Sequence, residues 1–389
     1  MNRFRRSIAS VGLGLSLLAG LVAGVASTAQ PANASTSVAN LGTVDGHKTS
    51  INTYGLQTAY NPKSAAHNGS TDVYHCSLIN PHVSSSRYIV ASEFMPGAPK
   101  EVHHAIYFLI EPDHVAKAEA LNASGNGHGW GCFGAPLNPT GSFDGTPWLG
   151  GWAPGATLSV LPKGVGILVP KGSMIVMQIH YNLLRGTAPD NSKVRLVTIP
   201  AAGTNLKAME IAQYIAPPDY PCAAGITGPL CDRNAAVANL IARTGPQAGS
   251  FLSTIENFCK PTHDFNNLQT DGPLVSTTCA WHVSQTMHVV GISPHMHLTG
   301  ISQVVTLTHD GQTTTLVNEP HYNFDHQYSH KVPANTVAVP GDTFTVTCTY
   351  DPRLRQRNPQ LRQLPPRYVV WGDGSSDEMC LADVGYTAN

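Results

Sequence analysis

Charged side chains are scarce in this chain. Asp, Glu, Lys and Arg make up 12% of the 389 residues, about half the usual share. The formal net charge is −1, so the chain has no electrostatic attraction for nucleic acid or for an acidic membrane surface. We therefore expect no nucleic-acid partner.

Long apolar segments and long helical segments are also missing. After residue 34 no stretch reaches about 18 uninterrupted apolar residues, so we expect no membrane span in the mature chain. The best helical patterns, residues 114–121 and 235–243, are short. Gly and Pro, at 36 and 29 copies, predict many turns in place of long helices.

The N-terminal segment, residues 1–34, has the pattern of a signal peptide. Three arginines lie among the first six residues, an apolar run follows, and Ala32-Asn33-Ala34 is a small-x-small cleavage site. The apolar run is long, so an uncleaved membrane anchor is the alternative. Its many Gly and Ser residues and the cleavage site favour removal. The protein is therefore predicted to be secreted or extracytoplasmic.

The eight cysteines contain no CxxC pair, which argues against a metal–thiolate site. An even number of cysteines in an exported chain predicts disulfides. Sequence alone does not fix their pairing. The cysteines are Cys76, Cys132, Cys222, Cys231, Cys259, Cys279, Cys348 and Cys380.

Short runs rich in β-branched and aromatic residues dominate the chain. They are residues 88–91, 102–110, 174–181, 193–197, 305–308 and 343–348. Asp310-Gly311 is a strong hairpin turn signal. Many short strands with Gly and Pro turns predict an all-β sandwich or barrel. A domain boundary is expected near residues 199–203, and residues 217–275 are expected to be a loop-like insertion pinned by local disulfides.

Histidine, at 18 copies, is unusually frequent. His295 and His297 are separated by one residue, so on a strand both would project from the same face and suit two ligands of one metal. On its own, a His-x-His pair is better interpreted as two polar residues on a solvated strand face than as a metal site. The metal hypothesis therefore depends on ligands elsewhere in the chain.

Further candidate ligands are His103, His104, His180 and Met379. Adjacent residues on a regular strand face opposite ways, so His103 and His104 can share a metal only if a β-bulge re-aims one of them. Without a bulge one would be buried and the other exposed. Met379 on its own would be a core residue, but a thioether together with imidazoles suits Cu(I) better than zinc.

These stretches together resemble the copper type II, ascorbate-dependent monooxygenases. They occur in the family's order and cover nearly the whole mature chain. The matching stretches are Asp72-Val73-Tyr74-His75-Cys76, Val102-His103-His104, Leu161-Pro162-Lys163-Gly164-Val165-Gly166, Gln178-Ile179-His180-Tyr181, Met287-His288 with His295-Met296-His297-Leu298-Thr299-Gly300, and Ser375-Ser376-Asp377-Glu378-Met379-Cys380.

The resemblance implies two tandem antiparallel, jelly-roll-like β-sandwich domains, residues 44–198 and 199–389, with one copper ion each. It implies a monooxygenase that uses O2 and ascorbate as the reductant. Two ligand sets follow from it: His103, His104 and His180 for the electron-transfer copper, and His295, His297 and Met379 for the catalytic copper. Gln178, on the same strand face as His180, is a candidate for orienting the imidazoles.

The resemblance also bears on the disulfides. Two pairs match family disulfide positions, Cys76 with Cys132 and Cys348 with Cys380. Cys279 matches a family cysteine whose usual partner has no counterpart here. We therefore expect it to pair with Cys259.

The departures from the family concern the substrate. The amidating branch binds a peptide carboxylate through an Arg where this chain has Ser293. It has Asn and Tyr where this chain has Leu381 and Asp383. A C-terminal glycine peptide is therefore not expected, and the substrate, a small molecule or peptide-like, stays open. An extracytoplasmic copper-binding or copper-delivery protein without turnover is the alternative function, and a structural sandwich whose histidines bind nothing is a third.

Overall fold

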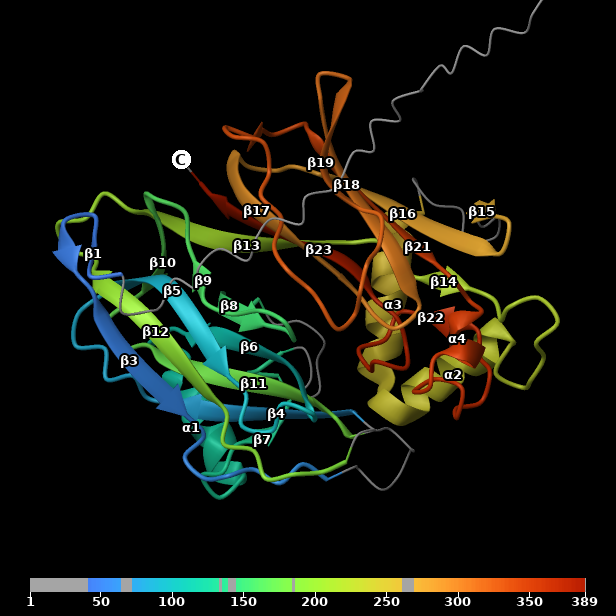
Figure 1. Cartoon of the computed structure of the whole chain (residues 1–389), viewed down its shortest axis with the longest axis horizontal. Helices are drawn as coiled ribbons and strands as arrows, with labels where there is room; N and C mark the ends of the chain where they lie inside the picture. Colours follow the sequence, from blue (N-terminus) through green and yellow to red (C-terminus); the bar gives the residue numbers. More distant parts are fainter. Residues whose placement is uncertain are drawn as a thin grey trace, which may run out of the picture. The chain divides into compact units, whose positions relative to one another are not determined.

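Alternating sequence runs form strands with one buried side. In β21, Thr343–Tyr350, every second residue is buried and the residues between are partly exposed. The computed structural model describes residues 41–63, 72–132, 135–138, 145–183, 186–260 and 269–388. Strands dominate these residues, which confirms the all-β prediction (Figure 1). The predicted signal peptide lies outside the described residues.

The first half is a sandwich of two sheet layers. One layer has the strand order β7-β4-β11-β6-β8. Its strands are β4 Asp72–Ile79, β6 Val102–Ile110, β7 Trp130–Gly131, β8 Trp148–Trp152 and β11 Met174–Asn182. The facing layer contains β3 Ser50–Gly55, β5 Arg87–Met95, β9 Ser159–Val160, β10 Val165–Val169 and β12 Lys193–Pro200.

Alternation along β6 assigns its two faces to different cores. Tyr107 packs with Phe94 of β5 in the core between the layers. Phe108 lies on the other face, where α1, Val115–Ser124, covers the sheet through Ala118. A small ribbon of β1, Thr43–Val44, and β2, His47–Lys48, precedes these layers in the sequence.

The second half repeats the sandwich architecture. One layer has the order β15-β16-β21-β18-β19. Besides β21, its strands are β15 Gln269–Asp271, β16 Leu274–His282, β18 Gly300–His309 and β19 Gln312–Glu319. The facing strands are β13 Lys207–Ile215, β17 Met287–Met296, β20 Val337–Ala338 and β23 Cys380–Thr387. The remaining elements are β14 Asp219–Tyr220, α2 Arg233–Thr244, α3 Pro246–Cys259, α4 Leu354–Arg357 and β22 Val369–Val370.

One strand pairing connects the two sandwiches. β10 runs parallel to β13, with Val165 opposite Lys207, and this pairing makes a single nine-stranded sheet out of one layer from each half. The halves keep separate cores, whose buried members come from residues 79–196 and 214–386. Contacts join the described residues between 41 and 388 into one compact unit. The division into domains 44–198 and 199–389 stays a prediction.

The segment 217–275 is not the loop that the sequence analysis expected. Both short helical predictions are confirmed as α1 and α2, but α3 was not predicted. Pro246 occupies the first turn of α3, where its missing N–H costs nothing. Leu252, Ile255 and Cys259, spaced to share one helix face, are its buried residues. Packing of this apolar stripe against the rest of the protein stabilises α3. Polar residues between the apolar ones make its helical periodicity hard to recognise in the sequence.

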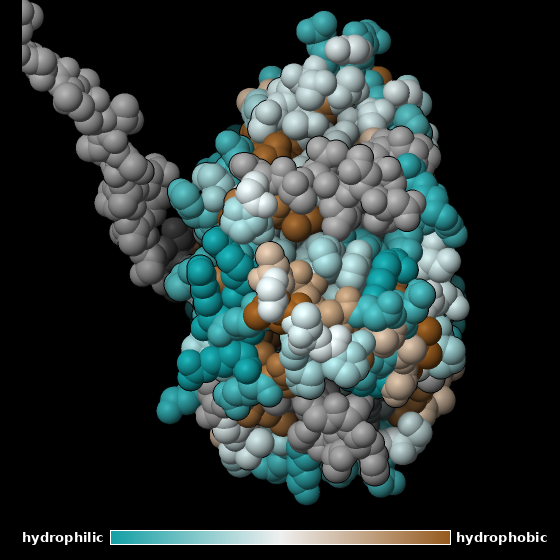
Figure 2. All heavy atoms as spheres, turned by 90° about the vertical axis from the view of Figure 1, so that its right-hand side faces the viewer, coloured by the Kyte–Doolittle hydropathy of each residue, from teal (hydrophilic) through white to brown (hydrophobic). Residues whose placement is uncertain are grey.

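The four disulfides are Cys76–Cys132, Cys222–Cys231, Cys259–Cys279 and Cys348–Cys380. They confirm the two family-like pairs and the expected partner of Cys279. Among the described residues no helix is long and apolar enough to span a membrane. On the face shown in Figure 2, hydrophobic side chains form small patches among hydrophilic ones.

Candidate metal centres

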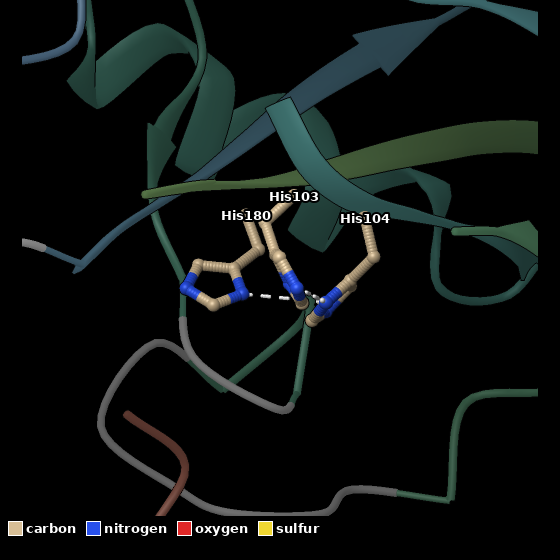
Figure 3. Close-up of side chains that lie close together, drawn as sticks. All are labelled: His103, His104 and His180. Atoms are coloured by element: carbon tan, nitrogen blue, oxygen red, sulfur yellow. Dashed lines mark hydrogen bonds between the residues drawn. The ribbon is translucent and has the colours of Figure 1, made fainter. Parts of the chain in front are cut away.

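A β-bulge brings His103 and His104 to one place. In the pairing of β11 with β6, His180 lies opposite His104 and the next residue, Tyr181, lies opposite Val102. His103 is therefore the extra residue of a bulge, and the regular alternation that would separate the two side chains is interrupted. Figure 3 shows the three imidazoles converging. The bulge on which the three-histidine hypothesis depended is present.

The spacing of the three rings fits a common ligand-binding centre. The Nδ1 atom of His104 lies 3.2 Å from Nδ1 of His103 and 3.3 Å from Nδ1 of His180. Imidazole–metal bonds of about 2.0–2.1 Å in tetrahedral geometry place the nitrogens about 3.3 Å from each other. The donor set is therefore compatible with a bound metal ion. Its assignment as copper ligands stays a prediction.

Neighbouring side chains orient the rings. His180 Nε2 donates to Asp72 Oδ1 at 2.8 Å, which leaves its Nδ1 lone pair facing the other histidines. The Tyr74 ring stacks on His180 with the ring centroids 4.1 Å apart. Burial, reinforced by the neighbouring His180 and His103, holds the pKa of His104 well below its usual value. Because metals bind neutral imidazole, this environment favours the ligand form.

Gln178 does not orient these imidazoles. Its Nε2 lies 3.4 Å from Sγ of Cys132, beside the Cys76–Cys132 disulfide. The expectation that Gln178 orients His180 was wrong, because Asp72 on the neighbouring strand β4 occupies that role. Asp72 and Tyr74 belong to the stretch of residues 72–76 that resembles the family. Only the pairing of β4 with β11 shows that these two side chains reach His180.

The second histidine pair lies at the end of β17. His295 is in the strand and His297 follows it, with the ring centroids 5.3 Å apart at an interplanar angle of 87°. Met296 pairs with Cys380 of β23, so Met379 lies at the same end of this strand pair. His295, His297 and Met379 line one cleft of about 670 Å³, and His104 of the first set lines it too.

Hydrogen bonding in the second set fits metal ligation. His295 Nδ1 donates to Gln327 Oε1 at 2.7 Å, which leaves Nε2 with its lone pair. His297 Nδ1 is buried and has no hydrogen-bond partner among the residues that the structure describes, which is compatible with a nitrogen that binds a metal. Burial lowers the pKa of His295 to about 4, although the Gln327 hydrogen bond opposes this. With the Met379 thioether, the set has the soft character that suits Cu(I).

Glu378 holds the backbone of this second set. Its carboxylate accepts hydrogen bonds from the backbone N–H groups of His297, Thr299 and Met379, and from the Thr299 hydroxyl. Glu378 is fully buried. Burial raises the pKa of Glu378 to about 7, against the lowering effect of these hydrogen bonds. The sequence analysis gave Glu378 no role, although it lies beside Met379 in one of the stretches that resemble the family.

The loop that precedes Met379 is anchored from several directions. Arg243 and Arg367 lie 2.6 and 3.1 Å from Asp377 Oδ1. Burial raises the pKa of Asp377, but the two guanidinium groups outweigh it and the net pKa is lowered. The Cys348–Cys380 disulfide fixes the residue after Met379 to β21. The position of Met379 is thus fixed by the ion pairs of Asp377 before it and by the disulfide of Cys380 after it.

Contacts also connect the two sets. Ser375 Oγ donates to Asp72 Oδ1 at 2.7 Å, and Tyr74 OH donates to the carbonyl of Asp373 at 2.5 Å. The rings of His104 and His295 have centroids 6.2 Å apart. Hydrogen bonds therefore join the neighbours of the three-histidine set to the loop that leads to Met379.

Comparison with known structures gives remote likenesses. An allantoicase is 9% identical over 84% of this chain and 83% of its own, with a TM-score of 0.18. An allantoicase from Saccharomyces cerevisiae is 10% identical over 83% and 80%, with a TM-score of 0.18. A fucolectin from striped bass (Morone saxatilis) serum is 12% identical over 80% and 85%, with a TM-score of 0.19. These values support no conclusion about fold or function.

The curated proteins contain no match to this chain. The family comparison does give a match, over residues 267–388, which hold His295, His297 and Met379. The three-histidine set lies outside the matched segment. Residues 267–388 match the model of the copper type II ascorbate-dependent monooxygenase, C-terminal domain.

Proposed function

We propose that this protein is an extracytoplasmic copper-dependent monooxygenase that hydroxylates a C–H bond of its substrate with O2 and a one-electron reductant such as ascorbate. The observation that carries the proposal is the His295, His297 and Met379 set, which lies in the family-matched segment and opens into the cleft of about 670 Å³. That volume is typical of a pocket for a small organic ligand.

The two candidate ligand sets have different donor atoms, which supports different roles for them. Copper bound at both sets would supply single-electron chemistry, which the reduction of O2 requires. Met379 adds a soft ligand only to the second set, so that set is proposed as the catalytic one. His103, His104 and His180 offer nitrogen donors alone and are proposed to hold a second copper, which when bound would supply electron-transfer chemistry.

Other residues orient the candidate ligands and keep water out of the cleft. Asp72 fixes the donor face of His180, Gln327 fixes that of His295, and Glu378 holds the backbone that carries His297 and Met379. The catalytic set lies against the apolar wall of the cleft, where Trp152 and Leu161 are among the lining residues. An apolar wall protects a C–H substrate and its reactive partners from bulk water.

An extracytoplasmic location has separate support. All eight cysteines form disulfides, and disulfides persist in oxidising compartments. The proposed signal peptide, residues 1–34, would direct export. Sequencing the N-terminus of the exported protein tests that proposal.

The function is tested with purified mature protein loaded with copper. We expect ascorbate-dependent O2 uptake that is stimulated by the true substrate, and a product that gains one oxygen by mass spectrometry. Asp310→Asn, a change at an exposed turn carboxylate that is not among the residues lining the cleft, is the control. Stable copper binding with no substrate-coupled O2 uptake across a broad metabolite extract would favour the copper-delivery alternative.

A further inference from the structure

The ring of Phe324 lies between one histidine of each candidate ligand set. Phe324 belongs to the connection between β19 and β20, in the second half of the chain. Its ring stacks on the ring of His103, with the centroids 4.0 Å apart at an interplanar angle of 17°. It also meets the ring of His297 in a T-shaped arrangement, at 5.8 Å and 85°. One side chain therefore contacts the first set through His103 and the second set through His297.

These three rings are packed away from solvent. His103, Phe324 and His297 are all buried. Stacked and edge-to-face arrangements are those that aromatic pairs prefer, and a close-packed interior transmits displacements between neighbours. A change in the position of either histidine therefore moves the Phe324 ring against the other one.

The connection that carries Phe324 is anchored to the second histidine pair. Gln327 Nε2 donates to the carbonyl of Phe324 at 2.9 Å, and Gln327 Oε1 accepts from His295 Nδ1 at 2.7 Å. Tyr322 OH donates to the carbonyl of Met296 at 2.7 Å and accepts from the Met296 N–H at 2.9 Å. The backbone of Phe324 is thus held to the strand that carries this pair.

The ring of His103 has a different support from the ring of His180. His180 is held by the Asp72 carboxylate and by the stacked Tyr74 ring, both of which belong to the first half. His103 is the extra residue of the bulge, where the regular ladder that fixes side-chain direction is disrupted. The ring that stacks on it comes from the second half. The geometry of the three-histidine set therefore depends on a residue outside the first half.

Resting on the proposed function, we propose that Phe324 is a positioning residue that couples copper binding at the two sets. Once His103 or His297 is fixed by a bound ion, the Phe324 ring between them is fixed as well. The histidine of the other set is then already held in place, so binding there costs less conformational freedom. By thermodynamic linkage, each set raises the copper affinity of the other by the same factor.

The test is a cycle of Cu(I) affinities, measured without O2 in the full mature protein by competition with a chromophoric chelator. Met379→Ile gives the affinity of the three-histidine set alone, and His180→Ala gives that of the second set alone. The coupling factor is the overall affinity of the unmodified protein for two ions, divided by the product of these two affinities. We expect a factor of at least about 5, the lower end of typical couplings between sites.

Replacing the ring should abolish the coupling. Phe324→Leu should give a coupling factor close to one when the same cycle is measured in its background. Phe344→Leu is the matched control and should keep the coupling, because Phe344 is another buried phenylalanine of the second half whose ring stacks on an aromatic side chain, Tyr214. Phe324→Met, which fills the space with a flexible apolar side chain, replaces Phe324→Leu if that variant folds poorly.

Three results would overturn the proposal. They are independent copper binding in the unmodified protein, an unchanged coupling factor in Phe324→Leu or Phe324→Met, and an equal loss of coupling in Phe344→Leu.

A second connection between the sets is tested in the same way. Ser375→Ala removes the hydrogen bond to Asp72 and leaves the ring contacts of Phe324 in place, so it should keep the coupling. Coupling that is lost in Ser375→Ala and kept in Phe324→Leu would assign it to Asp72 and overturn the role of Phe324.

The outcomes also separate this inference from the proposed function. Coupled copper binding that depends on Phe324, without substrate-dependent O2 uptake, would support the positioning role and count against the monooxygenase. Ascorbate-driven hydroxylation by a protein whose two sets bind copper independently would support the monooxygenase and overturn the role of Phe324.

Discussion

Ser375 Oγ donates to Asp72 Oδ1 at 2.7 Å, and the same carboxylate oxygen lies 2.8 Å from His180 Nε2. Asp72 belongs to the strand beside His180, and Ser375 belongs to the loop that leads to Met379. Both side chains are almost completely buried. One hydrogen-bonded carboxylate therefore connects the three-histidine set to the segment that positions the second set.

Asp72→Asn should weaken copper binding at the three-histidine set. The amide cannot provide the charged acceptor that fixes the His180 ring, and loss of such a partner commonly costs about 10–100-fold in metal affinity. Competition with a chromophoric Cu(I) chelator measures the affinity. Ser375→Ala, which leaves the Asp72–His180 contact in place, is the control and should cost less. Equal affinity in Asp72→Asn and the unmodified protein would contradict the assigned role.

Glu378→Gln should destabilise the second half. The amide presents a single acceptor oxygen, so buried N–H groups of His297, Thr299 or Met379 lose a partner. Each such loss costs about 1–3 kcal/mol. Urea unfolding of the metal-free protein measures the free energy of unfolding. A change within experimental error would show that these N–H groups find other acceptors.

Removing the Cys348–Cys380 disulfide should loosen Met379 before the fold is lost. A paired Cys348→Ser and Cys380→Ser variant should keep copper at His103, His104 and His180 and lose it at the second set. The matched control removes Cys222–Cys231, which closes a separation of 9 residues, compared with 32 for Cys348–Cys380. Copper retention at both sets in the first variant would show that the disulfide does not position Met379.

The pKa of Asp383 predicts a pH dependence of stability. Its pKa is raised from 3.8 to about 6 in the folded protein, so the protonated form is favoured by folding. The resulting stabilisation is complete below pH 3.8 and is lost as the pH rises through about 6. The free energy of unfolding of metal-free protein should therefore fall less over this interval in Asp383→Asn than in the unmodified protein. Identical pH profiles would contradict the assigned burial.

The strands could be predicted, and the candidate ligands could be named, because their signals lie in short stretches of the sequence. Alternation of apolar residues marks β21, and spacing marks the His295 and His297 pair. The bulge at His103 is different, because it exists only in the pairing of β6 with β11. From the sequence we could infer that His103 and His104 need a bulge to share a metal, but we could not infer that the bulge forms.

The supporting residues were not predictable for the same reason. Asp72 and Ser375 are 303 positions apart, and no local pattern indicates that they meet. The α3 helix depends on packing of its apolar stripe against residues such as Trp371. Asp383 was noted only as a departure from the family, and the strand pairing shows that it lies between Gln213 and Ser293 on the wall of the cleft.

The most direct measurement of the central claim is copper stoichiometry alongside ascorbate-driven O2 uptake in three proteins: unmodified, Met379→Ile and His180→Ala. Met379→Ile keeps a similar volume, so packing should cost less than about 1.5 kcal/mol, but it removes the sulfur donor. The account predicts two copper ions per chain in the unmodified protein, about half that content in each variant, and turnover in neither variant. Near-normal turnover in Met379→Ile, or a saturated stoichiometry of one in the unmodified protein, would contradict it.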